Sequence, residues 1–316
     1  MFKFNLKIIL YVIGILLAFN GGLMLLAALI SFLMKDGVSS EITLCAFIVM
    51  GMGASMVLIF RNHHTNIQKR EGYLIVTIGW LLMAVTGMLP FLTTGSIDSV
   101  YDAFFETMSG YTATGSTILT DIESLPAGVL FWRSMMHWIG GMGIIVLAIA
   151  ILPLLGIGGM QLFSAEAPGP NSDKLHPRIT DTAKRLWFIY VAYTIVETLL
   201  LYLAGMSLFD AVNHAMSTIS TGGFSTKSKS IAFWNDKPLI QYIIIIFMFL
   251  AGTNFVLSYF AFTRKFQKII QDEEFKLYTR FIIFFSFLVI VFNLLSQNLP
   301  ADSILNRLEP TFRNAI

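Results

Sequence analysis

Long uninterrupted runs of apolar residues dominate the chain. A helix that crosses a hydrocarbon core of about 30 Å needs roughly 20 such residues. The runs that approach or exceed this length are 8–34, 42–60, 72–97, 134–165, 186–209, 238–263 and 281–301. Within the fifth run, Glu197 is the one charged residue. We therefore predict seven membrane-spanning helices, of which the fourth is bent at Pro153 or within Gly156–Gly159.

The composition indicates that lipid surrounds most of the surface of the protein. Of the 316 residues, 56% are hydrophobic and 13% are charged, whereas a soluble domain has roughly 25% charged residues. The net charge of +2 gives no sign of nucleic-acid binding. The single cysteine, Cys45, excludes an intrachain disulfide framework and a thiolate metal site. The first apolar run is too long for a cleaved signal peptide, so we interpret it as a retained membrane helix.

Basic residues concentrate in alternate loops. They are Lys3, Lys7, Arg61, Lys69, Arg70, Lys174, Arg178, Lys184, Arg185, Arg264, Lys265, Lys268, Lys276 and Arg280. If each predicted span crosses the membrane, all of them lie on one face, which the positive-inside rule makes cytoplasmic. On the opposite face, Lys227, Lys229 and Lys237 break the rule locally. The charges predict a cytoplasmic N-terminus.

Two moderately polar stretches lie where plain external loops are expected. Residues 99–115 align with residues 207–223 at an offset of 108. The identical positions are Ser99/Ser207, Asp102/Asp210, Ala103/Ala211, Met108/Met216, Ser109/Ser217 and Gly115/Gly223. Each stretch is predicted to form a helix of about ten residues, capped by Asp102 or Asp210, and then an irregular Thr/Gly loop. Irregular backbone at membrane depth must be buried in protein or line a watery cavity, so both stretches are predicted to be re-entrant pore loops.

The two loops carry the residue types of a potassium filter. Such a filter replaces the hydration shell of the ion with backbone carbonyls, and it needs glycine where the backbone takes a positive φ. The candidate filter residues are Thr112, Ala113, Thr114 and Gly115 in the first loop and Ser220, Thr221, Gly222 and Gly223 in the second. Each preceding helix would direct its negative C-terminal end at the cation. An acidic cluster, Asp98, Asp102, Glu106, Asp121 and Glu123, is predicted at the mouth, where it would concentrate cations.

Four segments resemble signature sequences of the Trk/Ktr/HKT potassium transporter family. They are residues 111–117, 131–144, 177–184 and 217–225. The bacterial Trk membrane subunit is the most similar branch, because it too has two extra helices before its first unit. The resemblance implies an all-α integral membrane fold, in which four helix–pore-loop–helix units surround one pseudo-fourfold pore. It further implies K⁺ as the cargo, no cofactor, the bacterial cytoplasmic (inner) membrane, a homodimer and a cytosolic nucleotide-binding regulatory subunit.

The chain accounts for only part of such an arrangement. The expected parts are two extra helices in 1–70, the first unit in 71–165, the second unit in 166–270 and the start of the third in 271–316. Residues 312–316 resemble residues 212–216 at an offset of 100, which would put the third filter glycine about seven residues beyond Ile316. We therefore expect a fragment that holds two of four filter loops. The alternative is a split transporter whose remaining half is supplied in trans.

Several polar residues within or beside the apolar runs have two possible roles. Arg133 could position cations beside the filter or act as an interfacial anchor that snorkels. Asn254 could line the pore or hydrogen-bond to a neighbouring helix. Glu197 is buried by sequence, and we favour a structural hydrogen bond to a neighbouring helix over a functional role. His137 and His214 lack a metal-binding spacing, so structural hydrogen bonds are expected for both.

Three alternative interpretations compete with a pore. A secondary cation symporter, with ions bound at broken helices, predicts inverted repeats, whereas the two copies here keep the same orientation. An intramembrane enzyme needs clustered acids, histidines or a nucleophile at membrane depth, and the sequence offers no such cluster. Ordinary turns between amphipathic helices would explain one Thr/Gly run more easily than two matched copies. Coupling of the flux to H⁺ or Na⁺ stays open.

Overall fold

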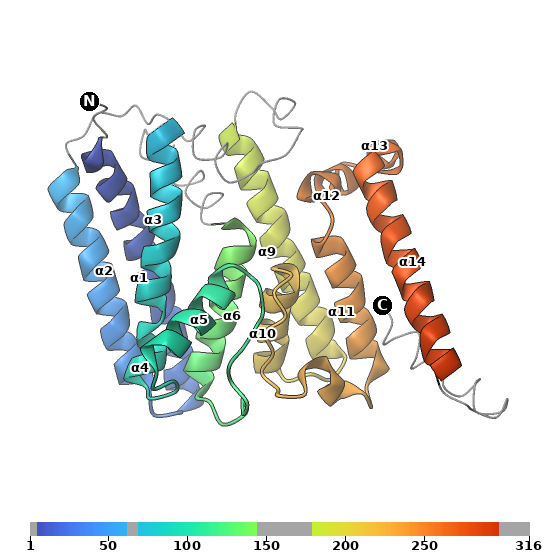
Figure 1. Ribbon diagram of the computed structural model, residues 1–316, viewed down its shortest axis with the longest axis horizontal. Helices are drawn as coiled ribbons and strands as arrows, with labels where there is room; N and C mark the ends of the chain where they lie inside the picture. The colour runs from blue at the N-terminus through green and yellow to red at the C-terminus, as the bar shows by residue number, and fades with distance from the viewer. Residues whose placement is uncertain (1–4, 62–68, 144–178, 297–316) are drawn as a thin grey trace.

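The computed structural model describes residues 5–61, 69–143 and 179–296, which form helices joined by turns and loops (Figure 1). The longer helices are α1 (Leu6–Met34), α2 (Ser39–Phe60), α3 (Lys69–Gly87), α6 (Ala127–Gly141), α9 (Ile179–Leu203), α11 (Pro238–Ala251) and α14 (Glu273–Ser296). The shorter ones are α4 (Leu89–Thr93), α5 (Val100–Tyr111), α10 (Leu208–Ile219), the 3₁₀ turn η3 (Ser230–Trp234), α12 (Phe255–Phe262) and α13 (Phe266–Gln271). These described ranges contain no strand, which agrees with the predicted all-α class.

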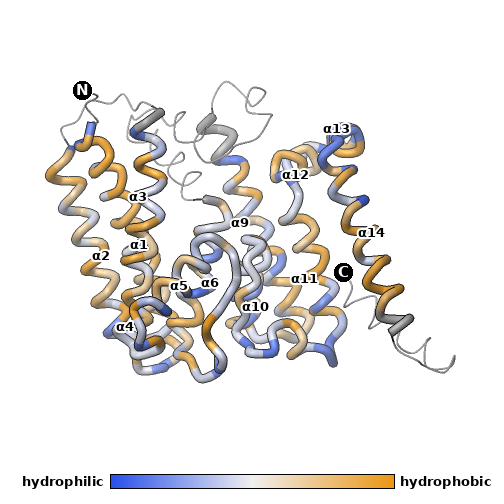
Figure 2. The backbone as a smooth tube through the Cα atoms, viewed as in Figure 1, coloured by the Kyte–Doolittle hydropathy of each residue, from blue (hydrophilic) through white to orange (hydrophobic). Residues whose placement is uncertain are grey.

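Five segments of these helices are long and apolar enough to cross a membrane. They are Leu6–Met34, Ser39–Phe60, Glu71–Thr93, Lys184–Leu203 and Glu273–Phe292. Figure 2 shows apolar residues along the helix shafts and hydrophilic residues mostly near their ends. In α14 the spanning segment is not buried against the rest of the described chain, and Phe284, Phe287 and Phe292 are exposed. A continuous apolar surface of this kind needs lipid or further protein around it.

The two N-terminal helices pack closely through small residues. A Cβ on Gly21 of α1 would lie 2.6 Å from the backbone nitrogen of Met50, and a Cβ on Gly53 of α2 would overlap the backbone of Ala18. Small residues allow such close approach of membrane helices. The pair shares one apolar core with α3, α5 and α6. The N-terminal helices therefore support the first predicted unit.

The second predicted unit lies beside the first. A second apolar core joins α9, α10, η3 and α11. In each unit a short helix, α5 or α10, rises from the side opposite the N-terminus, and the chain then turns back toward that side (Figure 1). α10 contacts both α9 of its own unit and α6 of the first. The two units therefore meet at the predicted pore loops.

The sixth predicted span, 238–263, is broken rather than straight. α11 and α12 meet at an angle of 104°. The Tyr278 hydroxyl of α14 donates to the carbonyl of Phe249, at 3.4 Å, near the end of α11. The side chain of Asn254 accepts a hydrogen bond from the backbone N–H of Val256, at 3.0 Å, at the start of α12. These bonds satisfy two of the backbone groups that a helix end leaves free, so the break is stabilised without a proline.

Three other predicted spans begin earlier in the structure. α6 begins at Ala127 instead of residue 134, α9 at Ile179 instead of residue 186, and α14 at Glu273 instead of residue 281. An uncharged run starts only after the last charged residue of the N-terminal turns, which is Arg133, Arg185 or Arg280, so that criterion leaves those turns out. The bend predicted at Pro153 or Gly156–Gly159 and the similarity of residues 312–316 lie outside the described residues.

Candidate ion-permeation site

The two short helices α5 and α10 begin with the same cap. The Ser99 hydroxyl accepts a hydrogen bond from the backbone N–H of Asp102, at 3.4 Å, and the Ser207 hydroxyl accepts one from Asp210, at 3.0 Å. The prediction that Asp102 and Asp210 are the caps is therefore wrong. The carboxylates lie in the first turn, three residues after a serine cap. This arrangement resembles a capping box and places negative charge at the positive end of the helix dipole.

The two loops also share their backbone hydrogen bonds. In the first loop the donors Thr112, Ala113 and Thr114 bond to the carbonyls of Met108, Gly110 and Ser109. In the second loop the donors Ser220, Thr221 and Gly222 bond to the carbonyls of Met216, Thr218 and Ser217. Every pair in one loop matches a pair in the other at the offset of 108 that the sequence repeat gave. The repeat therefore extends from residue types to backbone geometry.

Left-handed backbone recurs at the same positions of both loops. Gly115 has a φ of 77° and Gly223 a φ of 97°, which confirms the positive φ predicted for these glycines. Ala113 and Thr221, which also align, have φ values of 51° and 57°. A left-handed residue with a Cβ costs roughly 1–2 kcal/mol, and such strain clusters at functional sites. Both loops therefore contain this unfavourable backbone conformation at the same aligned position.

The structure brings the two loops into contact. A Cβ added to Gly115 would overlap the carbonyl oxygen of Gly222 and would lie 3.6 Å from the Cα of Gly223. Gly223 itself has open space around its Cα. Thr112, Thr114 and Thr221 are likewise exposed among the described residues. The eight predicted filter residues therefore lie on two adjoining loops that present part of their surface to open space.

A buried ion pair lies behind the loops. Glu106 of α5 accepts a hydrogen bond from Nε of Arg133 of α6, at 2.9 Å, and the same carboxylate oxygen lies 2.8 Å from Nη2 in the ion pair. The side chains are 0% and 1% exposed. Glu106 is therefore not part of the acidic mouth, and Arg133 does not snorkel to an interface. A charge buried this deeply needs a partner, which explains why the two residues are together.

Arg133 also links the segments that follow the two predicted filters. Its Nη2 donates to the Thr117 hydroxyl at 3.2 Å, and its Nη1 donates to the carbonyl of Ser225 at 3.3 Å. Its guanidinium carbon lies 4.0 Å from the ring centroid of Phe224. Thr117 follows the first predicted filter, whereas Phe224 and Ser225 follow the second. The planar guanidinium, with five donors in a fixed geometry, thus holds both loops at once.

The other predicted mouth acids are exposed on the side from which α5 and α10 rise. They are Asp98, Asp102, Asp121 and Glu123. The Glu123 carboxylate accepts hydrogen bonds from the hydroxyl and, at 3.0 Å, from the backbone N–H of Ser228. These bonds hold the pKa of Glu123 below its ordinary value. The Ser228 hydroxyl also accepts a hydrogen bond from the backbone N–H of Ile122, at 3.1 Å, so the segments that follow the two loops are joined.

The buried histidines and Glu197 have different surroundings. The Nδ1 of His214 lies 2.8 Å from the carbonyl of Asp210 and its Nε2 lies 3.0 Å from the Ser225 hydroxyl, which confirms the predicted structural bonds. The Nδ1 of His137 lies 3.2 Å from the Ser217 hydroxyl. The Glu197 carboxylate interacts with the Thr218 side chain of α10, a neighbouring helix, although neither of its oxygens has a partner of full hydrogen-bond geometry in the described ranges. The bond predicted for Glu197 is therefore represented there only by this weaker contact.

Among the described residues, Asn254 makes no side-chain hydrogen bond to a neighbouring helix. Its side-chain oxygen caps its own helix, α12, and its side chain is exposed. This cap was not predictable, because hydropathy does not distinguish a polar residue within a helix from one in a break between helices. The role that we predicted for it in the pore remains a proposal.

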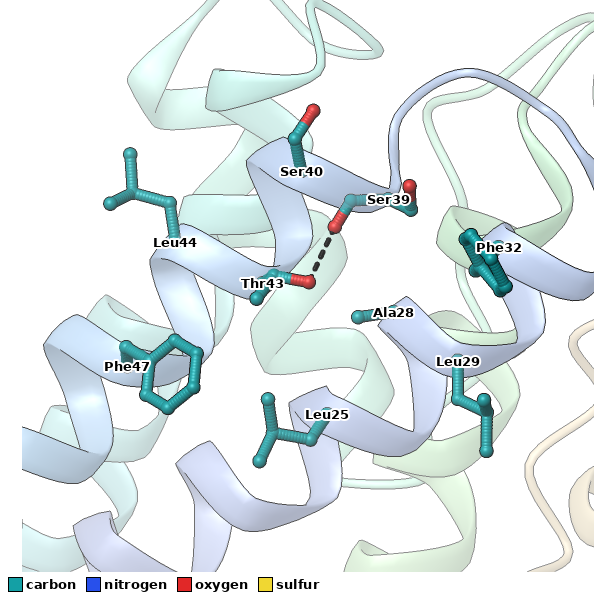
Figure 3. Close-up of a pocket in the computed structure, with 9 residues that line it drawn as sticks. All are labelled: Leu25, Ala28, Leu29, Phe32, Ser39, Ser40, Thr43, Leu44 and Phe47. Atoms are coloured by element: carbon teal, nitrogen blue, oxygen red, sulfur yellow. Dashed lines mark hydrogen bonds between the residues drawn. The ribbon is translucent and has the colours of Figure 1, made fainter.

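A groove elsewhere in the molecule offers no cation chemistry. It has a volume of about 540 Å³ and opens between α1 and α2 (Figure 3). Its lining consists of Leu25, Ala28, Leu29, Phe32, Ser39, Ser40, Thr43, Leu44 and Phe47. The hydrogen bond drawn there, from the Thr43 hydroxyl to the carbonyl of Ser39, is internal to α2. The lining carries no charge, so the loops remain the candidate site.

Sequence reasoning missed the contacts that hold the loops together. It did not foresee the partners of Arg133, which are Glu106, Thr117 and the Phe224–Ser225 segment. One signal was available: an arginine close to the start of an apolar run requires a buried acid, and Glu106 lies in the middle of the first predicted pore helix. No comparable signal marked Ser228.

Comparison with known proteins agrees with this architecture. Residues 39–299 match the TrkH family model, described as a cation transport protein. The Trk system potassium uptake protein TrkH of Salmonella typhimurium is 43% identical over 270 residues, 84% of this chain and 56% of the relative. The protein of that name from Halomonas elongata is 40% identical over 301 residues, 94% of this chain and 61% of the relative.

A solved structure shows the same fold. The crystal structure of the potassium transporter TrkH from Vibrio parahaemolyticus superposes with a TM-score of 0.81 at 35% sequence identity. It covers 98% of this chain, which in turn covers 64% of that one. The present chain thus spans a little over half the length of the relatives that it matches. With its apolar spans and re-entrant loops, the chain belongs to the TrkH family, whose members are multi-pass membrane transport proteins and not enzymes.

Proposed function

We propose that this chain contributes to potassium uptake across a membrane as the membrane subunit of a Trk-type system. In this proposal, backbone carbonyls of Thr112–Gly115 and Ser220–Gly223 bind K⁺. The observation that carries it is the contact between two loops with the same caps, backbone bonds and left-handed positions. The relatives named as potassium uptake proteins support the choice of ion.

The backbone geometry suits a carbonyl filter. Left-handed residues 113 and 115 alternate with residues whose φ is not positive, such as Thr112 at −79°. Residues 221 and 223 alternate in the same way, after Ser220 at −78°. Alternation of handedness turns successive peptide groups so that their carbonyls face one side. A line of carbonyls on one side is what replaces the hydration shell of potassium.

The electrostatics favour a cation at the loops. α5 and α10 end at the two filters, so the negative ends of their dipoles lie beside the proposed ion positions. The exposed acids Asp98, Asp102 and Asp121 lie on the outer side and would raise the local cation concentration. Arg133 is neutralised by Glu106, so it places no unpaired positive charge behind the filters.

The wider assembly follows from the family. We propose that residues 71–165 and 166–270 are two units of a four-unit pore, after two extra helices in 1–70 and before a third unit that begins in 271–316. A homodimer and a cytosolic nucleotide-binding regulatory subunit belong to the same proposal. The basic residues on the N-terminal side support a cytoplasmic N-terminus in the inner membrane of a bacterium.

A second candidate function is ion-coupled symport at a broken helix. The 104° break between α11 and α12 is the observation that favours it, because secondary transporters bind ions at such breaks. Against it, the two loops repeat in the same orientation rather than inverted. Measuring whether K⁺ uptake stops when the H⁺ or Na⁺ gradient is removed separates a coupled carrier from a passive filter.

The filter proposal is tested by glycine substitution in the full-length gene product. Gly223→Ala should lower the ratio of K⁺ to Na⁺ uptake by about tenfold, the effect of 1.4 kcal/mol, in cells that lack their own potassium uptake. Gly37→Ala is a matched control, because Gly37 also has a positive φ, 87°, and open space around its Cα but lies in the α1–α2 turn. An unchanged ratio in Gly223→Ala would refute the filter assignment.

A further inference from the structure

His137 reaches from the first unit into the second filter. The residue belongs to α6 and is completely buried. Its Nδ1 lies 3.2 Å from the hydroxyl oxygen of Ser217, at the end of α10. The same hydroxyl accepts a hydrogen bond from the backbone N–H of Gly223, at 3.1 Å. A chain of two hydrogen bonds therefore runs from a side chain of one unit to the filter backbone of the other.

The imidazole ring also fills the space behind this filter. It stacks on Phe224, with ring centroids 3.9 Å apart and an interplanar angle of 10°. A Cβ on Gly222 would overlap the His137 ring. Position 222 therefore accepts only glycine while the histidine is in place, and the ring limits movement of the filter away from the pore side.

The donors and acceptors available at Ser217 show which group donates in its contact with His137. A serine hydroxyl has one donor and two acceptor lone pairs. Since the Ser217 oxygen accepts from Gly223, its own proton can be donated to Nδ1 of His137. The imidazole also interacts with the backbone of Ser109 in the first loop, but its Nε2 has no partner of hydrogen-bond geometry within the described part of the chain. The contact of Nδ1 with Ser217 is therefore the side-chain hydrogen bond that orients the ring.

The hydrogen bond that orients the Gly223 N–H also sets the direction of the Gly222 carbonyl. The N–H of Gly223 and the C=O of Gly222 belong to one peptide group, which is planar and trans, so the two point in opposite directions. The N–H is directed back to Ser217. The oxygen of Gly222 is correspondingly directed forward, onto the position where a Cβ of Gly115 would stand in the first filter. The orientation of a proposed K⁺-binding carbonyl thus depends on the bond at its back.

The first loop lacks this support. Ser109 is the repeat equivalent of Ser217, yet its buried hydroxyl has no hydrogen-bond partner within the ranges that the structure describes. The two filters therefore share a backbone conformation but differ in what holds it. Ser109 therefore serves as an internal control for Ser217, at the equivalent position of the repeat.

We propose that His137 is a positioning residue for the second filter and, through Ser217, sets its discrimination between K⁺ and Na⁺. The inference rests on the proposed function, because it assigns a selectivity role to a peptide group of the same filter. His137 does not touch the ion. It acts by holding the peptide between Gly222 and Gly223 in one orientation.

The test measures the ratio of K⁺ to Na⁺ uptake by the full-length protein in cells that lack other potassium uptake systems. Ser217→Ala and His137→Phe should each lower the ratio about two- to tenfold, the range expected for one hydrogen bond. His137→Phe keeps an aromatic ring to stack on Phe224. The double variant should lose no more than either single variant, because both changes break the same route.

Two further variants separate positioning from general stability. Ser109→Ala should change the ratio less than twofold, because the hydroxyl that it removes is not hydrogen-bonded within the described residues. His137→Asn places a polar atom near the position of Nδ1 and should recover part of the ratio lost in His137→Phe. If His137→Phe does not reach the membrane, Ser217→Ala carries the test, since it removes a single atom.

The outcomes distinguish this inference from the filter proposal. If Gly223→Ala lowers the ratio but Ser217→Ala behaves like Ser109→Ala, the role of His137 is overturned and the filter stands. Additive losses in the double variant would also overturn it, because they would show two independent effects. If Gly223→Ala has no effect either, the filter assignment itself fails.

Discussion

The pair formed by Arg133 and Glu106 allows a quantitative test of how the two loops are joined. Both side chains are essentially inaccessible, at 1% and 0% exposure. Removing one partner of such a pair leaves an uncompensated buried charge and costs about 3–5 kcal/mol. In Arg133→Met, Glu106 would keep its bonds from the Thr117 hydroxyl, at 2.9 Å, and from the backbone N–H of Ile118, at 3.1 Å. We therefore expect a loss of about 3 kcal/mol, at the lower end of that range.

The reverse change should cost more. Glu106→Gln keeps the shape of the side chain but leaves the Arg133 guanidinium without a counter-charge, so we expect a loss nearer 5 kcal/mol. In the double variant, which combines Arg133→Met with Glu106→Gln, no charge remains unpaired. Its loss should therefore be smaller than the sum of the two single losses, by up to about 3 kcal/mol. The free energy of unfolding can be measured for all four proteins by titration with SDS in mixed micelles.

A surface arginine is the matched control. Arg185 lies on α9, is exposed, and contacts Tyr259 through a hydrogen bond of 2.8 Å and a ring contact of 5.3 Å. Arg185→Met should cost less than about 1 kcal/mol, the value of an exposed cation–π contact. A loss in Arg133→Met no larger than in this control would show that the buried pair does not join the loops as described. Additive losses in the double variant would equally contradict it.

Two further predictions concern other acids. Glu197 is buried in α9 without a partner of full hydrogen-bond geometry in the described residues, and an unpaired charge at membrane depth is costly. Glu197→Gln should therefore keep the free energy of unfolding within about 1 kcal/mol of the parent, whereas Glu197→Lys should prevent accumulation in the membrane. Equal accumulation of the two variants would refute this. The bonds from Ser228 lower the pKa of Glu123, so they are present at neutral pH and are lost as the pH falls through that lowered pKa. Ser228→Ala removes the hydroxyl and should raise the pKa of Glu123 toward its ordinary value in an NMR titration of the carboxyl carbon. An unchanged titration would show that the hydroxyl is not the cause.

Much of the loop geometry was predictable from the sequence because it is local. A match of six residue types over residues 99–115 and 207–223 predicted two equivalent loops, and the structure repeats their backbone bonds. The need for left-handed backbone predicted positive φ at Gly115 and Gly223. The left-handed turns at Ala113 and Thr221 were not predictable, because neither residue type favours that conformation.

Other features depend on partners that are distant in the sequence. The break at Gly252–Asn254 is stabilised by Tyr278 of α14, and an apolar run carries no information on that contact. Arg133 and Glu106 are 27 residues apart, and no periodic pattern links them. The caps were missed for a different reason. Both Ser99 and Asp102 are of residue types that cap helices well, and only the backbone conformation shows that Ser99 is the N-cap.

The most direct test of the central claim is the position of the ion in the full-length transporter. A crystal structure of the protein in Tl⁺ or Rb⁺ reveals bound ions by their anomalous scattering. The account predicts an ion coordinated by backbone carbonyls of Thr112–Gly115 and Ser220–Gly223. Ordered ions confined to another place, such as the break between α11 and α12, with none at the two loops, would contradict it.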